Sequence, residues 1–198
     1  MYKKSEKLIM AVILVLSISI TGLMTGCGTT SKEKPENNKK KQEEEQSDKQ
    51  KNKKEEATVY IGYDQIGYQE YKVEIEGEIT PEKLIASIAE LTGWNLSLAD
   101  DVSSGKSGMT VNFSNESALV VGPPEKQKEE FRVYDIFSFT DLALDSIKET
   151  LQRNYVMEPC DPEILDVFYT LDGQAITVDG VVIPMEEPWE SGRFGIQE

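Results

Sequence analysis

The residue whose chemistry stands out first is Cys27. It follows Leu23-Met24-Thr25-Gly26 and ends an apolar stretch, Leu8–Ile20, which is preceded by Lys3, Lys4 and Lys7. Lysines, a short apolar core and then small residues are typical of a secretory signal peptide. Small residues near the cut let the backbone enter a peptidase, and the cysteine thiol can accept a diacylglycerol. We therefore expect residues 1–26 to be removed and Cys27 to be lipidated.

The segment before Cys27 resembles the lipobox of bacterial lipoproteins. The alternative is an uncleaved transmembrane helix, because the run from Leu8 to Gly26 approaches the roughly 20 apolar residues that a spanning helix needs. Cys27 lies where the apolar run ends and a polar segment begins, which favours the lipoprotein. Two acyl chains on one sulfur are enough for stable attachment. The membrane is therefore an expected partner through the lipid anchor, at its outer face.

Residues 28–57 have the composition of a tether. They contain nine lysines and eight acids and no aromatic or large aliphatic side chain. Such a segment cannot bury enough apolar surface to offset its ordering entropy. The sequence thus predicts three parts: a signal peptide at 1–26, a lipidated cysteine with a disordered tether at 27–57, and a folded domain at 58–198.

The predicted domain is strongly acidic. Residues 58–198 carry 27 acidic and nine basic side chains, a net charge of −18. Nucleic acid is not expected as a partner, because its negatively charged phosphates bind lysine and arginine side chains and are repelled by acidic ones. Cations and basic proteins could be attracted, although most of these acids are explained as groups that keep an exported domain soluble.

The remaining chemistry of the chain is sparse. Histidine, the commonest general base and metal ligand, is absent. Cys160 lies between acids, which disfavour a thiolate. The triplet Gly105-Lys106-Ser107 lacks the earlier glycine of a phosphate loop. Four aspartates could contribute to a calcium site, but each is explained by a turn: Asp100, Asp101, Asp172 and Asp179. We predict no catalytic, cofactor or metal site.

Patterning in the first half of the domain predicts strands and one helix. Thr58–Gly62 and Tyr71–Glu76 have strand patterns, and so do Asn95–Ala99 and Met109–Phe113. Thr80-Pro81-Glu82 is typical of a helix start, and Gly93 of a helix end. Ser103–Gly108 is expected to be a polar loop.

The second half of the domain predicts another strand, a helix and a group of short strands. Phe131–Tyr134 is expected to be a strand, and a helix capped at Ser138 or Thr140 is expected to run to about Asn154. The strands 167–171, 174–178 and 181–183 are separated by Asp-Gly pairs, a strong hairpin signal. Trp189 and Phe194 are expected to fold back on the core. The order of elements predicts an α+β domain, with two main helices packed on a mixed or antiparallel sheet.

Two stretches resemble the GerMN family, named after the spore germination protein GerM. One is the 80–93 helix with Asn95–Leu98, the Ser-Gly loop and Gly108–Ser114. The other is the second helix with Asp166–Ile176. The resemblance implies a compact α/β lipoprotein domain of spore-forming bacteria with a single membrane, similar to ring-building modules of the sporulation channel. It implies no catalytic residues. The resemblance implies one such unit in this chain, whereas GerM has two, and this difference argues against a ring-forming role.

These observations predict a non-enzymatic, membrane-anchored binding or assembly module at the cell surface, with a role in sporulation or germination. Its partner would be an envelope protein or a wall component. An envelope hydrolase that uses two acids in a cleft is the alternative, because carboxylate pairs with raised pKa values serve that chemistry. A transporter's ligand receptor is disfavoured, because such receptors have two lobes and more residues.

Overall fold

The computed structural model describes residues 53–63, 67–106 and 108–194. Cys27, the signal segment and residues 28–52 of the expected tether lie outside these residues. Within the described ranges, no helix combines the length and apolar character needed to span a membrane.

The domain begins with a long β-hairpin. Strand β1, Lys54–Tyr63, pairs antiparallel with β2, Gly67–Glu76, over ten residues each. Side chains alternate between a core-facing row and a solvent-facing row, as the two-residue period of a strand requires. The buried members of this hairpin are aliphatic: Ala57, Val59, Ile61 and Ile75.

Helix α2, Pro81–Thr92, forms where the sequence predicts it. The Thr80 side chain accepts a hydrogen bond from the Lys83 N–H, Pro81 occupies the first helical position, and Gly93 ends the helix in the left-handed conformation. A Cβ at Gly93 would lie 2.9 Å from the Lys126 carbonyl oxygen, so a glycine is required there for space as well as for φ.

Helix α4, Ile136–Tyr155, is the centre of the fold. Its N-cap is Asp135, whose carboxylate accepts the Ser138 N–H, so the prediction of a cap at Ser138 or Thr140 is wrong. The helix gains a turn because the Asp135 side chain satisfies a free N–H of the first turn. Fully buried side chains lie along its length: Phe139, Ala143, Leu144, Ile147 and Leu151.

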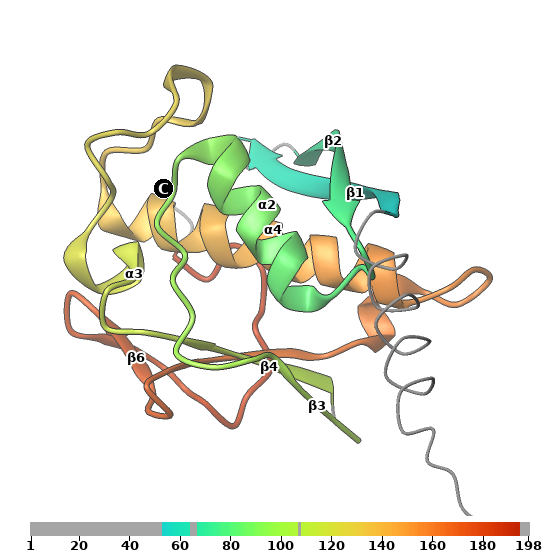
Figure 1. The fold of residues 1–198 in the computed structure, drawn as a ribbon. Helices are drawn as coiled ribbons and strands as arrows, with labels where there is room; N and C mark the ends of the chain where they lie inside the picture. The colour runs from blue at the N-terminus through green and yellow to red at the C-terminus, as the bar shows by residue number, and fades with distance from the viewer. Residues whose placement is uncertain (1–52, 64–66, 107, 195–198) are drawn as a thin grey trace, which may run out of the picture. The chain divides into compact units, whose positions relative to one another are not determined.

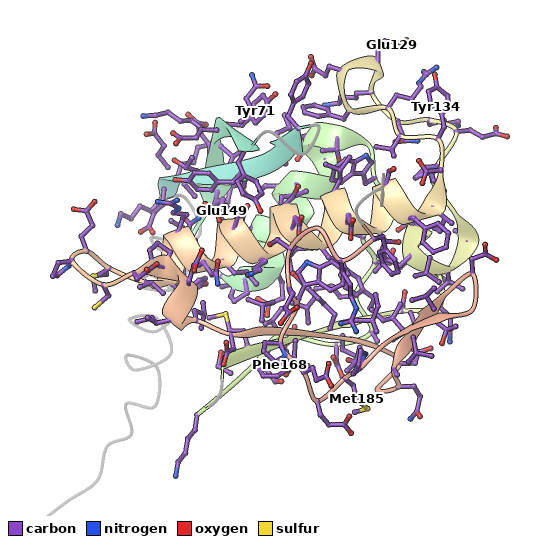
Figure 2. The ribbon with its side chains drawn as sticks, turned by 180° about the vertical axis from the view of Figure 1, so that it is seen from behind. Tyr71, Glu129, Tyr134, Glu149, Phe168 and Met185 are labelled. Carbon is purple, nitrogen blue, oxygen red and sulfur yellow. The ribbon has the colours of Figure 1, made fainter. Side chains whose placement is uncertain are left out.

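A three-stranded sheet lies on the other side of α4 from the hairpin (Figures 1 and 2). Strand β4, Gly108–Phe113, lies in the middle, between β3, Ser103–Gly105, and β5, Val167–Leu171. The β3–β4 pair is antiparallel and the β4–β5 pair is parallel. β4 and β5 are joined by a long connection that contains α4, as a parallel pair requires.

The last strands form a small hairpin, as predicted. β6, Ile176–Val178, pairs antiparallel with β7, Val181–Ile183. Asp179 and Gly180 have φ values of 44° and 85° in the turn between them. Asp172 and Gly173 have φ values of 45° and 72° in the turn that joins β5 to β6. Positive φ at both central residues is the requirement that Asp-Gly pairs meet in such turns.

The class predicted from the sequence, α+β, is confirmed. The two main helices pack with strands on a common apolar core; the three-stranded sheet is mixed and the two hairpins are antiparallel. The strands form three small sheets, and α4 separates the first hairpin from the other two (Figure 1). The shorter helix α3, Ala118–Val121, and two 3-10 turns, Glu129–Phe131 and Pro162–Ile164, complete the described part.

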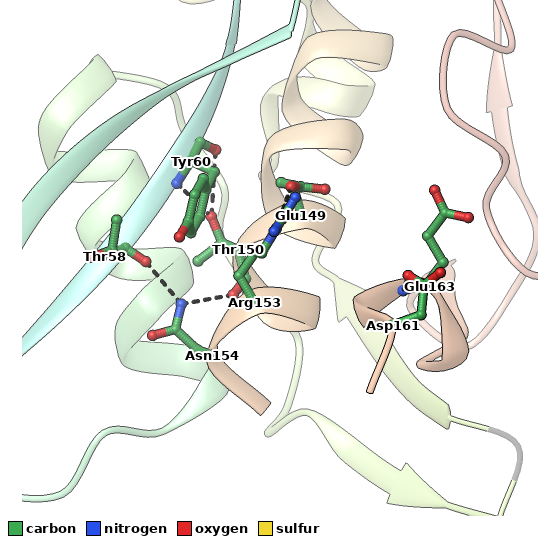
Figure 3. Close-up of polar contacts among 8 residues, drawn as sticks. All are labelled: Thr58, Tyr60, Glu149, Thr150, Arg153, Asn154, Asp161 and Glu163. Atoms are coloured by element: carbon green, nitrogen blue, oxygen red, sulfur yellow. Dashed lines mark hydrogen bonds and ion pairs between the residues drawn. The ribbon is translucent and has the colours of Figure 1, made fainter. Parts of the chain in front are cut away.

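Polar side chains of α4 close the free edge of β1. Ser146 Oγ accepts from the Gly62 N–H, Thr150 Oγ1 accepts from the Tyr60 N–H, and Asn154 Nδ2 donates to the Thr58 carbonyl. Figure 3 shows the last two contacts. Ser146, Thr150 and Asn154 are spaced by four residues and so share one helix face. We call this set the edge ladder, because it occupies the backbone groups that a neighbouring strand would bind.

Several local predictions are corrected. β1 begins at Lys54, and Ala57 is buried, so residues 54–57 belong to the domain and not to the tether. Phe131–Tyr134 is not a strand: Phe131 ends a 3-10 turn and packs edge-on against Tyr71. Asn95–Ala99 is extended but makes only one bridge, Leu98 to Phe113. The expected polar loop contains β3.

The C-terminal segment folds back on α4, as predicted for Trp189 and Phe194. The Trp189 indole is buried, and its Nε1 donates to the Asp145 carboxylate at 2.6 Å. The Phe194 ring lies 5.2 Å from that of Phe137, between centroids. The final residues, 195–198, lie outside the described part.

Candidate functional site

One recess in the described surface is a groove between α2 and the extended segment that follows it. Its volume is about 340 Å³. Gly93 ends α2, and in Figure 1 the chain turns at the end of this helix and runs away from it. One wall consists of Glu82, Ile85, Ala86 and Ala89, and the other of residues 94–98. We call this recess the groove.

Local sequence explains why the two walls diverge. Trp94 is buried immediately after the Gly93 turn, where its Nε1 donates to the Phe131 carbonyl at 3.2 Å. Its ring meets Phe139 of α4 edge-on, with the ring centroids 5.6 Å apart. These contacts fix where the extended segment starts. Ala86 and Ala89 leave space beside it, because a methyl group is all that either places in the groove.

The extended segment has one paired edge and one unpaired edge. The Ser97 carbonyl accepts from Ser114, and the Ala99 N–H donates to Asn112, both at 2.9 Å. Backbone groups of successive residues in a strand point in opposite directions. Those of Leu96 and Leu98 therefore point away from β4. Among the described residues, neither Leu96 nor Leu98 makes a backbone hydrogen bond.

A second, more polar recess adjoins the groove and shares Ser97 and Leu98 with it. It has a volume of about 660 Å³ and is open to solvent. We call it the polar hollow; Ala99, Ser114, Asn115, Glu116 and Asp172 complete its lining. The Asn95 side chain donates to the Glu116 carbonyl at 2.5 Å, and Asn115 donates to the Asp172 carboxylate.

The electrostatics of the two recesses are one-sided. Their linings contain three carboxylates, Glu82, Glu116 and Asp172, and no lysine or arginine. Burial raises the pKa of Glu82, but hydrogen bonds from Thr80 and from the backbone N–H groups of Glu82 and Val102 outweigh it, so the net pKa is lowered. Glu82 is therefore ionised at neutral pH, and the site favours a cationic ligand.

Two other carboxylates, Asp141 and Asp145, have raised pKa values. Burial raises the pKa of Asp141 to about 6, with further contributions from the negative charges of Asp145 and Asp135. Burial also raises the pKa of Asp145. Asp141 accepts the Phe194 N–H, and Asp145 accepts Trp189 Nε1 and the Gly192 N–H. Both belong to the attachment of the C-terminal segment and line neither recess.

The structure places the other candidate residues as follows. Cys27 lies outside the described residues, and Cys160 is an exposed free thiol. Asp100 accepts from Asn112, and Asp172 lies in the polar hollow, whereas Asp179 is a turn residue of the β6–β7 hairpin. Within the described ranges, no group of three or more acidic or cysteine side chains is arranged to hold a metal ion.

Sequence reasoning missed the groove as a site, although it included part of its wall. Ile85 and Ala89 widen the apolar stripe of α2, but Leu84, Ile85 and Ile88 are all buried in the core. A stripe of this width is ordinary for a helix that packs on a core, so it gave no signal of a groove. The second wall could not be inferred, because it depends on the course of the chain after Gly93.

No protein-family model, curated protein or solved structure matches the chain.

Proposed function

We propose that this chain is a non-enzymatic binding or assembly module held at the outer face of the cell membrane by lipid on Cys27. The observation that carries the binding function is the groove beside the unpaired edge of Leu96 and Leu98. Apolar recesses with a few polar groups are the usual form of a binding site. The signal-like N-terminus supports the anchor, and the resemblance to the GerMN family supports a setting in sporulation or germination.

The alternative is an envelope hydrolase that uses paired acids. Asp141 and Asp145 favour it through their raised pKa values, because tuned carboxylates are common in active sites. Their oxygens, however, accept hydrogen bonds from the C-terminal segment. A substrate would have to displace that segment before it reached either carboxylate. Binding is therefore the function that the geometry supports better.

The binding function is tested on the intact lipoprotein in its membrane. Chemical crosslinking followed by purification should recover a defined envelope partner. Ala86→Leu places a larger side chain in the groove and should reduce recovery at least fivefold. Glu90→Leu adds the same side chain to an exposed position of α2 outside the groove, and should leave recovery unchanged. Equal recovery with both variants would contradict a role for the groove.

The enzymatic alternative is tested by digestion of purified cell wall. The wild-type protein should release no soluble fragments above the buffer control. Fragment release that is lost in the Asp141→Asn/Asp145→Asn variant would establish a hydrolase and overturn the proposal.

The anchor is tested by metabolic labelling with a fatty-acid probe. Cys27→Ala should abolish label and leave the precursor at its uncut size, because the sulfur is the acceptor of the lipid. Label at the wild-type level in Cys27→Ala would refute the anchor and the localisation together.

A further inference from the structure

We propose that the groove and the polar hollow bind an extended, positively charged segment of a partner protein, which adds as a strand to Leu96–Leu98. This inference rests on the proposed binding function and adds the chemistry of the partner. The segment would place an apolar side chain in the groove and a lysine or arginine near the carboxylates.

The backbone of Leu96–Leu98 supports strand addition. On the β4 side, this segment makes the bonds of an antiparallel pair through Ser97 and Ala99. Its other side presents the N–H and C=O groups of Leu96 and Leu98, which are unpaired among the described residues. A peptide that adds to such an edge gains main-chain hydrogen bonds, and pockets for alternate side chains select its sequence.

The groove supplies such a pocket for an apolar side chain. Ile85, Ala86 and Ala89 of α2 face the apolar residues Trp94, Leu96 and Leu98 across it. Since side chains of a strand alternate in direction, the neighbours of the inserted side chain would point away from the groove.

Charge decides which partner fits. Three carboxylates and no cationic side chain line the two recesses, and Glu82 stays ionised at neutral pH. A second copy of this domain would bring another net charge of −18, counted over 58–198, and is disfavoured by repulsion. Nucleic acid is disfavoured for the same reason. A basic protein segment satisfies both the charge and the unpaired edge.

The test uses the mature chain, residues 27–198, with Cys27→Ser to keep it in solution. Three probe peptides with blocked ends are titrated and followed by NMR of the backbone amides. The first is Val-Lys-Val-Lys-Val-Lys-Val, the second has glutamate for each lysine, and the third is the lysine peptide N-methylated at alternate residues. N-methylation removes the donors that strand pairing needs and retains the charge.

The lysine peptide should shift the amides of Leu96, Ser97 and Leu98 in a saturable manner. The N-methylated peptide should bind at least tenfold more weakly, and the glutamate peptide should not bind. Ala86→Leu should weaken the lysine peptide at least tenfold, whereas Glu90→Leu should not. Glu82→Gln keeps an acceptor for the Val102 N–H but removes the charge, and should weaken binding about threefold; Glu125→Gln, outside both recesses, is its control.

Equal affinity for the N-methylated or glutamate peptide would overturn strand addition by a basic segment. So would shifts confined to another surface, binding of no peptide at all, or perturbation of these amides only by calcium or by dimerisation. The crosslinking experiment distinguishes failure of this inference from failure of the proposed binding function. If Ala86→Leu still prevents recovery of the envelope partner when every peptide fails, the binding function stands and this inference falls.

Discussion

At the scale of single residues, the buried polar side chains of this domain serve mainly to attach one segment to another. Among the described residues, every buried side-chain nitrogen or oxygen has a hydrogen-bond partner. An unsatisfied buried group costs about 1–3 kcal/mol, so each of these contacts can be probed by a small substitution. Two of these attachments to α4 are tested below. Asp141 holds the C-terminal segment, and the edge ladder holds β1.

Asp141 should make the stability of the domain depend on pH. Its pKa is raised in the folded state, from 3.8 to about 6, mainly by burial. A raised pKa means that its full contribution to stability is present below about pH 4 and is lost as the pH rises through about 6. Asp141→Asn retains an acceptor for the Phe194 N–H without a charge. Urea unfolding should show the variant gaining about 1–2 kcal/mol relative to wild type between pH 4.5 and 7.

Glu125→Gln, which removes one charge from a surface loop, is the control for this measurement. It should not reproduce the gain in stability that Asp141→Asn shows between pH 4.5 and 7. Parallel curves for wild type and Asp141→Asn would show that the Asp141 carboxylate titrates at its ordinary pKa.

Thr150 should be the critical hydroxyl of the edge ladder. Its Oγ1 accepts the Tyr60 N–H at 2.9 Å, so Thr150→Val leaves that donor without a partner. We expect a loss of about 1–2 kcal/mol in the free energy of unfolding. Thr140→Val is the matched control, because Thr140 is equally buried on α4 but its hydroxyl donates only to the Ile136 carbonyl of its own helix. Equal losses in the two variants would contradict the ladder.

At the scale of elements, the sequence predicted the helices and turns that are determined by contacts between nearby residues, and did not predict the pairings that depend on distant ones. Helix α2 was predicted because Thr80 and Pro81 at its start and Gly93 at its end each act on backbone groups within a few residues of themselves. The Asp-Gly turns were predicted for the same reason. The parallel pairing of β4 with β5 joins residues almost 60 positions apart, and the sequence of neither strand predicts which strand it pairs with. The Phe131–Tyr134 error has a similar cause, since contacts with Tyr71 and Trp94 override the apolar pattern of that segment.

The β4–β5 pairing depends on Gly108. Its φ is 134°, and a Cβ there would lie 2.1 Å from the Asp166 carbonyl oxygen, which accepts the Met109 N–H. Gly108→Ala should therefore destabilise the domain by about 3 kcal/mol or more, measured by urea unfolding. Gly105→Ala adds the same methyl group in β3, where no atom lies within 4 Å, and should change stability by less than about 0.5 kcal/mol. A tolerated Gly108→Ala would mean that this pairing contributes little.

At the scale of the whole molecule, charge repulsion should limit stability. The ion pairs of the described residues are short but lie largely at the surface, where each contributes about 0–1 kcal/mol. These ion pairs therefore offset little of the repulsion among the excess acids, which give residues 58–198 a net charge of −18. Salt screens charges over about 10 Å at 0.1 M. Thermal unfolding monitored by circular dichroism should show the Tm rising by a few degrees when NaCl is raised from 0.02 to about 0.3 M.

Calcium chloride at the same ionic strength should have the same effect, and a chelator should have none. The result that would contradict this is a saturable Tm increase at micromolar calcium that disappears in Asp100→Asn/Asp101→Asn. Such binding at a hundredfold excess over Kd would add about 2.7 kcal/mol to native stability, which calorimetry would resolve.

Because α4 supplies the edge ladder, the edge of β1 stays uncovered until that helix has been synthesised. The ribosome delivers the N-terminus first, so the β1–β2 hairpin leaves the exit tunnel long before the helix that closes its edge; Tyr60 and Thr150 are 90 residues apart. During that interval β1 is an open template for pairing with another nascent chain. Residues 54–76 carry six acidic side chains and two lysines, a net charge of −4. Two such hairpins repel each other, so this net charge disfavours pairing until α4 covers the edge.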